Sequence, residues 1–514
     1  MSLSYDTKPT TIHEDFAIAS VSDARAHDGA PYEPGGAEEK AFIRRLDMRM
    51  IPIIWFMYVM SYLDRANIGL PFDACRNAKT GGMETDLELT SYVIGEVPSN
   101  MILVRVKPAI YLPALMFTWG GISMCLAACN SYQTLAVVRF FLGVVEAGFA
   151  PGILFLLSSW YRKNELATRF ALYYTASAFS GALGGLLAGA ITGHLDGKGG
   201  LAGWRYLFLI EGAATIVSAA GAYFVLPNFP ATTRWLTERE KWLCAERLRA
   251  DGVGAAQGDA EVLGHGKAFK SVLSDWRTYV MTFLFMMVTG AQTIQYFIPT
   301  LTKNMGYKGT TAQYMTIPVS VRPLARGAAP FAEGCHLQIY MVAVVGILVI
   351  PMSSDRFKER PFHISISMGL GAGCFAVLIA TQKHIIQYVF LCFGVALIYA
   401  NAPLVLVWTS NIISYPAEKR AITQAFVNAL GNSASIYGAF LWPAKTGPKY
   451  IMGFSVTLAM LAACSIGAQA MRFLNTKYPY HFEMPARRQD IEMPEEFGTG
   501  AESPMEKSEI IHRE

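Results

Sequence analysis

Two pairs of charged residues lie inside long apolar stretches of this sequence. Asp64 and Arg65 are adjacent near the end of the stretch 48–70, and Arg139 and Glu146 lie seven residues apart in a later one. Seven residues make about two turns of a helix, or about 10.5 Å, so the second pair projects from one helix face. A charge inside a membrane span is costly unless it is paired or hydrated, so both pairs are candidate functional residues.

These four residues suit the binding of an anion together with a proton. A guanidinium group binds a carboxylate through two parallel hydrogen bonds and stays charged, so Arg65 and Arg139 are the candidate substrate-binding residues. A carboxylate in a desolvated cavity takes up a proton more readily, so Asp64 and Glu146 are the candidate proton-coupling residues. The alternative for Arg65 is a membrane anchor whose side chain extends to the lipid headgroups. The glycines around Glu146 allow close helix approach and favour a cavity-lining role: Gly143, Gly148 and Gly152.

The composition is that of an integral membrane protein. Of 514 residues, 53% are hydrophobic and only 16% are charged, whereas a soluble globular chain carries about 25% charged residues. The formal net charge of +4 is too small to indicate nucleic-acid binding. The eight cysteines form no CxxC motif, so we interpret them as small hydrophobic residues and expect neither disulfides nor a metal site.

Apolar segments of span length occur in two sets of six. They lie at about 48–70, 87–106, 109–129, 133–157, 168–192, 204–226, 277–300, 310–352, 361–380, 385–409, 420–443 and 450–474. We therefore predict disordered cytosolic tails over 1–45 and 476–514, helical bundles over 46–227 and 276–475, and a cytosolic linker over 228–275. Within the linker, TEREKWLCAERLR has the pattern of an amphipathic surface helix. Lysine and arginine cluster in every second loop, which predicts that both termini and the linker are cytosolic.

Five motifs carry a family resemblance: SYLDRANIG, EVPSN, RFFLGVVEAGFAPG, GWRYLFLIEG and SDRFKER, in this order over about 430 residues. Together they resemble the fungal allantoate/nicotinic acid permease branch of the anion:cation symporters, within the major facilitator superfamily. The segment PAEKRAITQAFVNALGNSASIYGAFLWP is similar to the nicotinic acid permease subgroup. The resemblance implies an all-α membrane protein with two six-helix bundles, a plasma-membrane location, and proton-driven uptake of a small carboxylate by alternating access. It also implies that Asp64, Arg65, Arg139 and Glu146 serve substrate binding and proton coupling.

Further polar residues lie in the later spans. In the major facilitator fold the seventh span lines the cavity, so Gln292, Gln295 and Tyr296 are candidate substrate contacts, with Asn401 opposite them. The alternative is that these residues form hydrogen bonds between helices, as Asn and Gln commonly do in membrane spans. We favour this interpretation for Asn428 and Asn432 on the eleventh span.

The motif SDRFKER resembles the cytosolic gate of the superfamily. Its residues Asp355, Arg356 and Arg360 are expected to tie neighbouring helices together in one state of the transport cycle.

Three places depart from the family pattern. The residues 70–76 are an insertion after the first span, and the second span is too short because only 89–103 is available to it. The eighth span is interrupted by the polar run 319–338, which cannot lie in lipid without exposing unsatisfied backbone groups. We interpret 319–338 as a retained intron, because its first and last codons can match splice sites and its length preserves the frame. A mature transcript that still encodes this run would contradict that interpretation.

The sequence thus predicts a proton-coupled symporter for a small organic anion, with the proton gradient as the driving force and no cofactor. Its partners are the anion, protons and the bilayer, without nucleic acid, and we expect a monomer. Three alternatives stay open: an exporter of a secondary metabolite, a nutrient sensor that does not transport, and an inactive gene model. An enzyme is excluded because the sequence shows no nucleophile–base constellation and no phosphate-binding loop.

Overall fold

A computed structural model gives the structure of residues 33–66, 94–251, 263–297, 339–381, 383–442 and 450–480. All regular structure in these ranges is helical, and they contain no strand. Seven helices of the described residues are long and apolar enough to cross a membrane. The interrupting run 319–338 and the insertion 70–76 lie outside the described residues.

The first set of helices runs from α2 to α9. Their bounds are α2 Ala37–Ala66, α5 Pro108–Leu126, α6 Tyr132–Glu146, α7 Phe149–Ser158, α8 Leu166–Leu195 and α9 Gly203–Val225, and residues 94–103 are also helical. Pro108 begins α5, where its missing N–H is not needed, and the Ser131 side chain caps α6 by accepting a hydrogen bond from the Thr134 N–H. Local sequence signals therefore fix where these helices begin.

The second set runs from α12 to α20. Their bounds are α12 Trp276–Gln292, α15 Ile339–Phe357, α16 Pro361–Ala380, α17 His384–Ile412, α18 Ala417–Asn432, α19 Ala434–Gly438 and α20 Ile451–Lys477. The predicted span 361–380 coincides with α16, and the part of the interrupted eighth span from Ile339 onward is the continuous helix α15.

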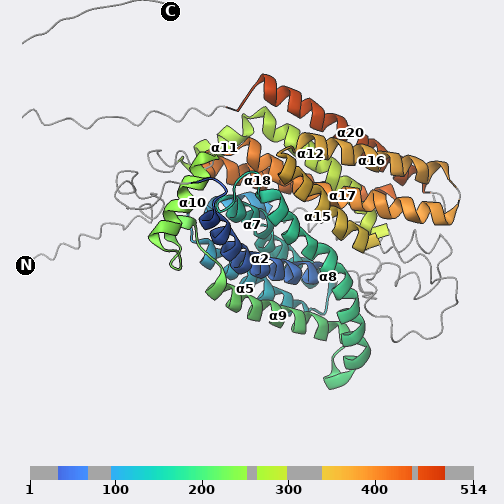
Figure 1. The fold of residues 1–514 in the computed structure, drawn as a ribbon. Helices are drawn as coiled ribbons and strands as arrows, with labels where there is room; N and C mark the ends of the chain where they lie inside the picture. The colour runs from blue at the N-terminus through green and yellow to red at the C-terminus, as the bar shows by residue number, and fades with distance from the viewer. Residues whose placement is uncertain are drawn as a thin grey trace, which may run out of the picture.

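The helices form two groups that lie side by side (Figure 1). In the first group α5 packs on α9, and α2 packs on α8 and α9. In the second group α16 packs on α17 and α20, α15 packs on α17, and α12 packs on α18 and α20. The groups meet where α8 contacts α15 and α17, and where α7 contacts α18. A site between the groups is therefore lined by these helices.

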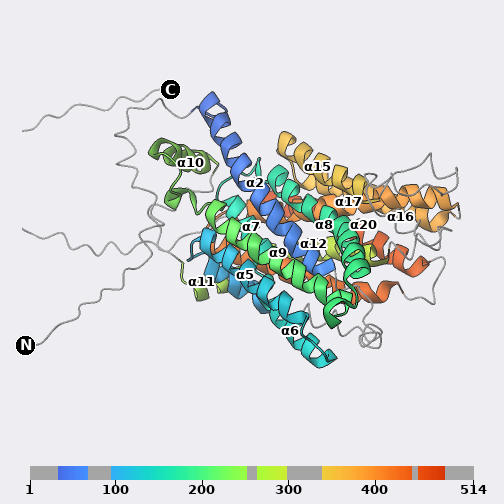
Figure 2. The same ribbon diagram turned by 90° about the horizontal axis from the view of Figure 1, so that it is seen from below.

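Two shorter helices, α10 (Glu238–Ala250) and α11 (His265–Leu273), lie at one end of the molecule (Figure 2). We call this the linker end. The helix predicted in the linker is confirmed as α10, which begins with a capping box between Thr237 and Glu240. Its buried Arg247 pairs with Glu39 at 2.6 Å and with Glu165 at 2.8 Å, which fastens α10 to the first group.

The pairing of Glu39 corrects one predicted boundary. The stretch 1–45 is predicted to be disordered, but α2 begins at Ala37. The reason is that Phe42 is buried and lies under the Arg247 guanidinium, which is 5.7 Å from its ring centroid. A polar sequence can therefore be helical where the linker helix covers it.

The predicted fourth span is divided into α6 and α7 by a turn at Ala147 and Gly148. The helical segment 94–103 lies against this turn. A Cβ atom at Gly148 would lie 1.7 Å from the Ser99 Oγ, and one at Gly95 would lie 2.5 Å from the Val144 carbonyl oxygen. Only glycine allows this approach, so these positions set the distance between the segment 94–103 and the helix pair.

Replacement of Gly148 tests this packing. We expect Gly148→Val to destabilise the protein by about 1–3 kcal/mol, the usual cost of overpacking, and to lower its unfolding temperature in detergent. Gly121→Ala on α5 is the matched control, because a Cβ atom there meets no atom within 4 Å. An equal unfolding temperature for Gly148→Val and Gly121→Ala would contradict the close approach.

Candidate functional site

The centre of the candidate site is one turn of α2. Asp64 is buried, and its carboxylate accepts hydrogen bonds from Ser123 Oγ of α5 at 3.3 Å and Thr215 Oγ1 of α9 at 3.4 Å. One turn earlier, Ser61 Oγ donates to Glu146 Oε1 at 2.5 Å. The structure therefore brings the two candidate proton-coupling carboxylates to the same turn of one helix, in the interior of the first group.

The two candidate arginines are placed differently. Arg139 is 7% exposed and lies on α6, which is continuous to Glu146, so the predicted spacing of two helical turns between them holds. Arg65 belongs to α2, but its side chain lies outside the described part of the chain. The described site therefore holds one buried cation and two buried carboxylates on α2 and α6.

A cavity of about 60 Å³ lies between the two groups, next to this turn. Its lining includes Tyr62 and Ala147, the sequence neighbours of Ser61 and Glu146. Tyr58 also lines it and stacks on Tyr173, with ring centroids 4.1 Å apart. Ligand pockets usually measure about 300–1,000 Å³, so this cavity has room for only a few water molecules in this structure.

Three amide side chains of α18 line the opposite wall of the cavity: Gln424, Asn428 and Asn432. Gln424 is 1% exposed, and neither its amide oxygen nor its amide nitrogen has a hydrogen-bond partner among the described residues. Asn428 donates a hydrogen bond to Glu96 of the first group. A hydrogen bond between helices was predicted for Asn428, and this one joins the two groups.

Gln424 is absent from the predicted site, but a sequence signal for it exists. Positions 424, 428 and 432 are spaced by four residues, which places three amides on one face of a helix.

Among the polar residues predicted on the seventh and tenth spans, Gln292, Gln295 and Asn401 do not line this cavity. Gln295 accepts a hydrogen bond from Tyr399, and Gln292 is buried with its amide nitrogen unpartnered in the described ranges. The side chain of Tyr296 lies outside the described residues. Asn401 of α17 and Ser367 of α16 exchange hydrogen bonds at 2.8 and 3.0 Å. This is a hydrogen bond between helices, the alternative role given above for Asn401. Whether these four residues contact the substrate is not tested by the structure, so that role stays a prediction.

The gate motif lies at the linker end, between the two groups. Asp355 at the end of α15 accepts hydrogen bonds from the backbone N–H of Thr168 at 2.6 Å and from its hydroxyl at 2.5 Å. Thr168 is in the first turn of α8, where the helix dipole and free N–H groups favour a negative charge. A carboxylate of the second group therefore caps a helix of the first.

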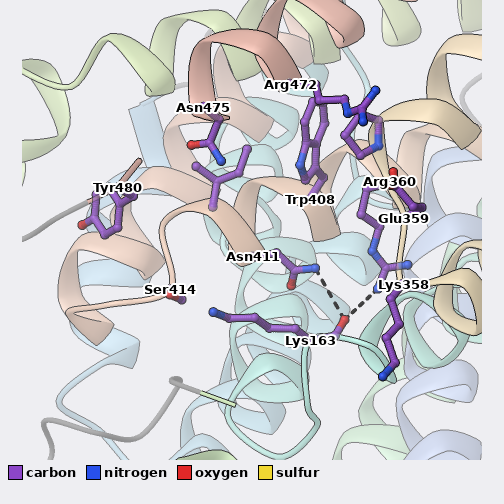
Figure 3. Close-up of a pocket in the computed structure, with 12 residues that line it drawn as sticks. Lys163, Lys358, Glu359, Arg360, Trp408, Asn411, Ser414, Arg472, Asn475 and Tyr480 are labelled. Atoms are coloured by element: carbon purple, nitrogen blue, oxygen red, sulfur yellow. Dashed lines mark hydrogen bonds between the residues drawn. The ribbon is translucent and has the colours of Figure 1, made fainter. Parts of the chain in front are cut away.

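Arg360 completes this connection. Its guanidinium donates to Asp355 and also to the carbonyl oxygen of Lys163 at 2.6 Å, in the loop between α7 and α8. The same carbonyl oxygen accepts from Asn411 of α17 at 3.5 Å (Figure 3). Arg356, the third residue of the predicted gate, is exposed. The linker end is thus closed by hydrogen bonds that cross between the groups.

Neutralising Asp355 should weaken this closure. Hydrogen bonds to a charged group contribute about 1.5–3 kcal/mol and neutral ones about 0.5–1.5 kcal/mol, so we expect Asp355→Asn to populate a conformation opened at the linker end. Nitroxide labels at Arg249 and Lys477, both exposed, report the distance across this end by electron paramagnetic resonance.

Asp196→Asn is the control for this experiment, because Asp196 accepts from Gly203 within the first group. Longer label distances in Asp355→Asn alone are expected. Unchanged distance distributions in both variants would show that Asp355 does not hold the end closed.

The described residues contain no group of three or more His, Cys, Asp or Glu side chains that could hold a metal ion. The site instead offers buried carboxylates, a buried arginine and, beside a cavity between two helical groups, the amide of Gln424, which has no hydrogen-bond partner among the described residues. This combination defines a membrane transporter, since such proteins bind solute between two helical halves.

Comparison with known proteins identifies the family. Residues 54–439 match the family model described as the Major Facilitator Superfamily. The MFS transporter prlL of Fungal sp. (strain NRRL 50135) is 32% identical over 478 residues, which cover 88% of this chain and 91% of that protein. The putative metabolite transport protein NicT of Pseudomonas putida is 30% identical over 358 residues, covering 68% and 76% of the two chains.

Among solved structures, the proton:xylose symporter XylE bound to 6-bromo-6-deoxy-D-glucose is similar in fold, with a TM-score of 0.58 at 15% identity. The match covers 84% of this chain and 96% of that one. The chain belongs to the major facilitator superfamily. The predicted all-helical major facilitator fold is therefore confirmed, and the protein is a multi-pass membrane transporter and not an enzyme.

Proposed function

We propose that this transporter carries a small organic anion, a nicotinate-like or other carboxylate, into the cell together with protons. The observation that carries the proposal is the pair of buried carboxylates: Asp64 on α2, and Glu146 on α6, which accepts a hydrogen bond from Ser61 one turn before Asp64. A carboxylate in a membrane span must be paired, hydrated or protonated, and here hydroxyl groups supply its described hydrogen bonds. Protons from the gradient would bind these groups, and no cofactor is needed.

The charge of the substrate follows from Arg139. This buried guanidinium lies two turns from Glu146 on the same helix. When Glu146 takes up a proton, the net charge of α6 becomes more positive, which favours the binding of an anion to Arg139. Coupling between proton and anion then needs no direct contact between them.

We also propose that the chain belongs to the anion:cation symporter branch, next to the fungal allantoate and nicotinic acid permeases. The sequence motifs support this assignment, and so does the 30% identity to NicT, which is named as a putative metabolite transport protein. In this proposal the protein is a monomer in the plasma membrane, and the linker end faces the cytosol with both termini.

Alternating access follows from the closed linker end. The contacts of Asp355 and Arg360 would break when the cavity opens toward the cytosol, and the cavity contracts between the two openings. Because a bound anion would attract α18 through Gln424 and α2 through its tyrosines, it favours the contracted conformation.

Uptake of radiolabelled nicotinate tests the coupling. We expect uptake that is faster at acidic than at neutral pH and that stops with a protonophore, in cells producing the chain with and without residues 319–338. Glu146→Gln should lower uptake by about 10-fold or more, since a charge-assisted hydrogen bond contributes about 1.5–3 kcal/mol, and should remove the pH response.

Glu238→Gln is the control, because Glu238 is an exposed residue of α10. Uptake by Glu146→Gln that equals the unsubstituted rate and is insensitive to the protonophore would refute coupling through Glu146. Net loss of label from preloaded cells, driven by the same gradient, would show export instead of uptake.

The role of Gln424 is tested separately. We expect Gln424→Leu to raise the KM for the transported anion about 3- to 10-fold, because one hydrogen bond contributes about 0.5–1.5 kcal/mol. Gln133→Leu, in the exposed first turn of α6, should leave the KM unchanged. Equal KM values for both variants would remove Gln424 from the substrate site.

A further inference from the structure

A second and larger cavity lies at the linker end, apart from the central one. It measures about 460 Å³, within the range of ligand pockets, and is lined by α16, α17, α20 and the loops before α8 and α16. Figure 3 shows its lining side chains. The two cavities share no lining residue, so the second one is a separate candidate site.

The lining of this cavity is strongly basic. Its cations are Lys163, Lys358, Arg360 and Arg472, and its only acidic lining residue is Glu359. The charge of Arg360 is already balanced by Asp355. Three cations therefore face one carboxylate, which leaves an excess of positive charge around the cavity.

Lys163 is the cation that most needs a partner. Burial lowers the pKa of its ammonium group, and nearby Arg420 lowers it further, while Asp251 opposes both effects. Within the described part of the chain, no hydrogen bond to the Lys163 Nζ is found, although its backbone N–H and carbonyl oxygen are both bonded. An anion in the cavity would stabilise this half-buried charge.

The other two cations of the cavity are Arg472 of α20 and Lys358 of the loop before α16. The Arg472 guanidinium stacks on Phe362, 3.9 Å from the ring centroid. The stacking involves the flat face of the guanidinium, so the N–H groups in its plane can still donate hydrogen bonds to a ligand. Lys358 has a left-handed backbone with φ of 55°, which its N–H bond to the Asp355 carbonyl oxygen supports. The three charges surround the cavity without meeting at one point (Figure 3).

We propose that this cavity binds an anion that carries two or more phosphate groups, through Lys163, Lys358 and Arg472. Cations that lie apart from one another suit a ligand with several phosphate groups better than a ligand with a single phosphate. Both ammonium and guanidinium groups bind phosphate. The anion is either the headgroup of a membrane phosphoinositide or a free phosphorylated solute, since the same groups recognise both.

Binding would regulate the transport cycle. Lys163 belongs to the loop before α8 in the first group, whereas Lys358 and Arg472 belong to the second. A ligand that contacts all three binds only while the linker end is closed, so it stabilises that state and slows opening. This inference goes beyond the proposed function and does not depend on the identity of the transported substrate.

Thermal unfolding of the purified full chain tests the site in two arms. The first adds inositol 1,4,5-trisphosphate to protein in detergent, and the second places the protein in phosphatidylcholine nanodiscs with or without phosphatidylinositol 4,5-bisphosphate. We expect a rise in unfolding temperature of several degrees with the phosphorylated ligand. A rise in both arms indicates that the headgroup suffices, and a rise in the second alone indicates a lipid site.

Three variants and a control locate the effect. Lys163→Gln, Lys358→Gln and Arg472→Gln should each reduce the ligand-dependent rise by half or more. Lys477→Gln should retain it, because Lys477 is an exposed residue of α20 that does not line the cavity. Lys358 is exposed, so its variant folds even if a more buried substitution does not. No rise in either arm, or an equal rise in Lys358→Gln and Lys477→Gln, would overturn the proposal.

Discussion

A charged side chain that leaves water must find its partners inside the protein, and this constraint shapes the structure described above. Asp64 and Glu146 are met by hydroxyl groups of neighbouring helices, and Asp355 is met by the first turn of α8. Each solution joins two helices that are far apart in sequence. These contacts therefore help to fix how pairs of helices distant in sequence are arranged.

The partners differ in what they allow. A hydroxyl group can either donate or accept a hydrogen bond, so the Ser61 hydroxyl that contacts Glu146 can serve in either direction. Asp355 accepts hydrogen bonds from the Thr168 hydroxyl and also from a backbone N–H and a guanidinium, which can only donate. The hydroxyl beside Glu146 can therefore adapt its hydrogen bond, whereas two of the three groups that bond Asp355 cannot.

Much of the fold could be predicted from the sequence because long apolar segments have one stable conformation in a bilayer. The position of α16 and the helix α10 followed from hydropathy and charge pattern. The turn between α6 and α7 did not, and the close contact there between Gly148 and the Ser99 side chain comes from a distant segment. Similarly, Arg139 and Glu146 could be recognised as charges in a span, whereas the spacing of Gln424, Asn428 and Asn432 does not by itself show that they line a cavity. Contacts between distant segments decide these features, and local sequence carries little information about them.

The helix α11 gives the closed conformation a dependence on temperature. Its buried residues Ala268 and Val272 cluster with Ile422 of α18, and Val97 and Met101 of the first group pack against this cluster. Separation of the groups at this end therefore exposes apolar surface to water, at about 25 cal/mol for each Å². Because hydrophobic association weakens on cooling, a lower temperature shifts the balance toward the open conformation, and the opening step has a positive heat-capacity change.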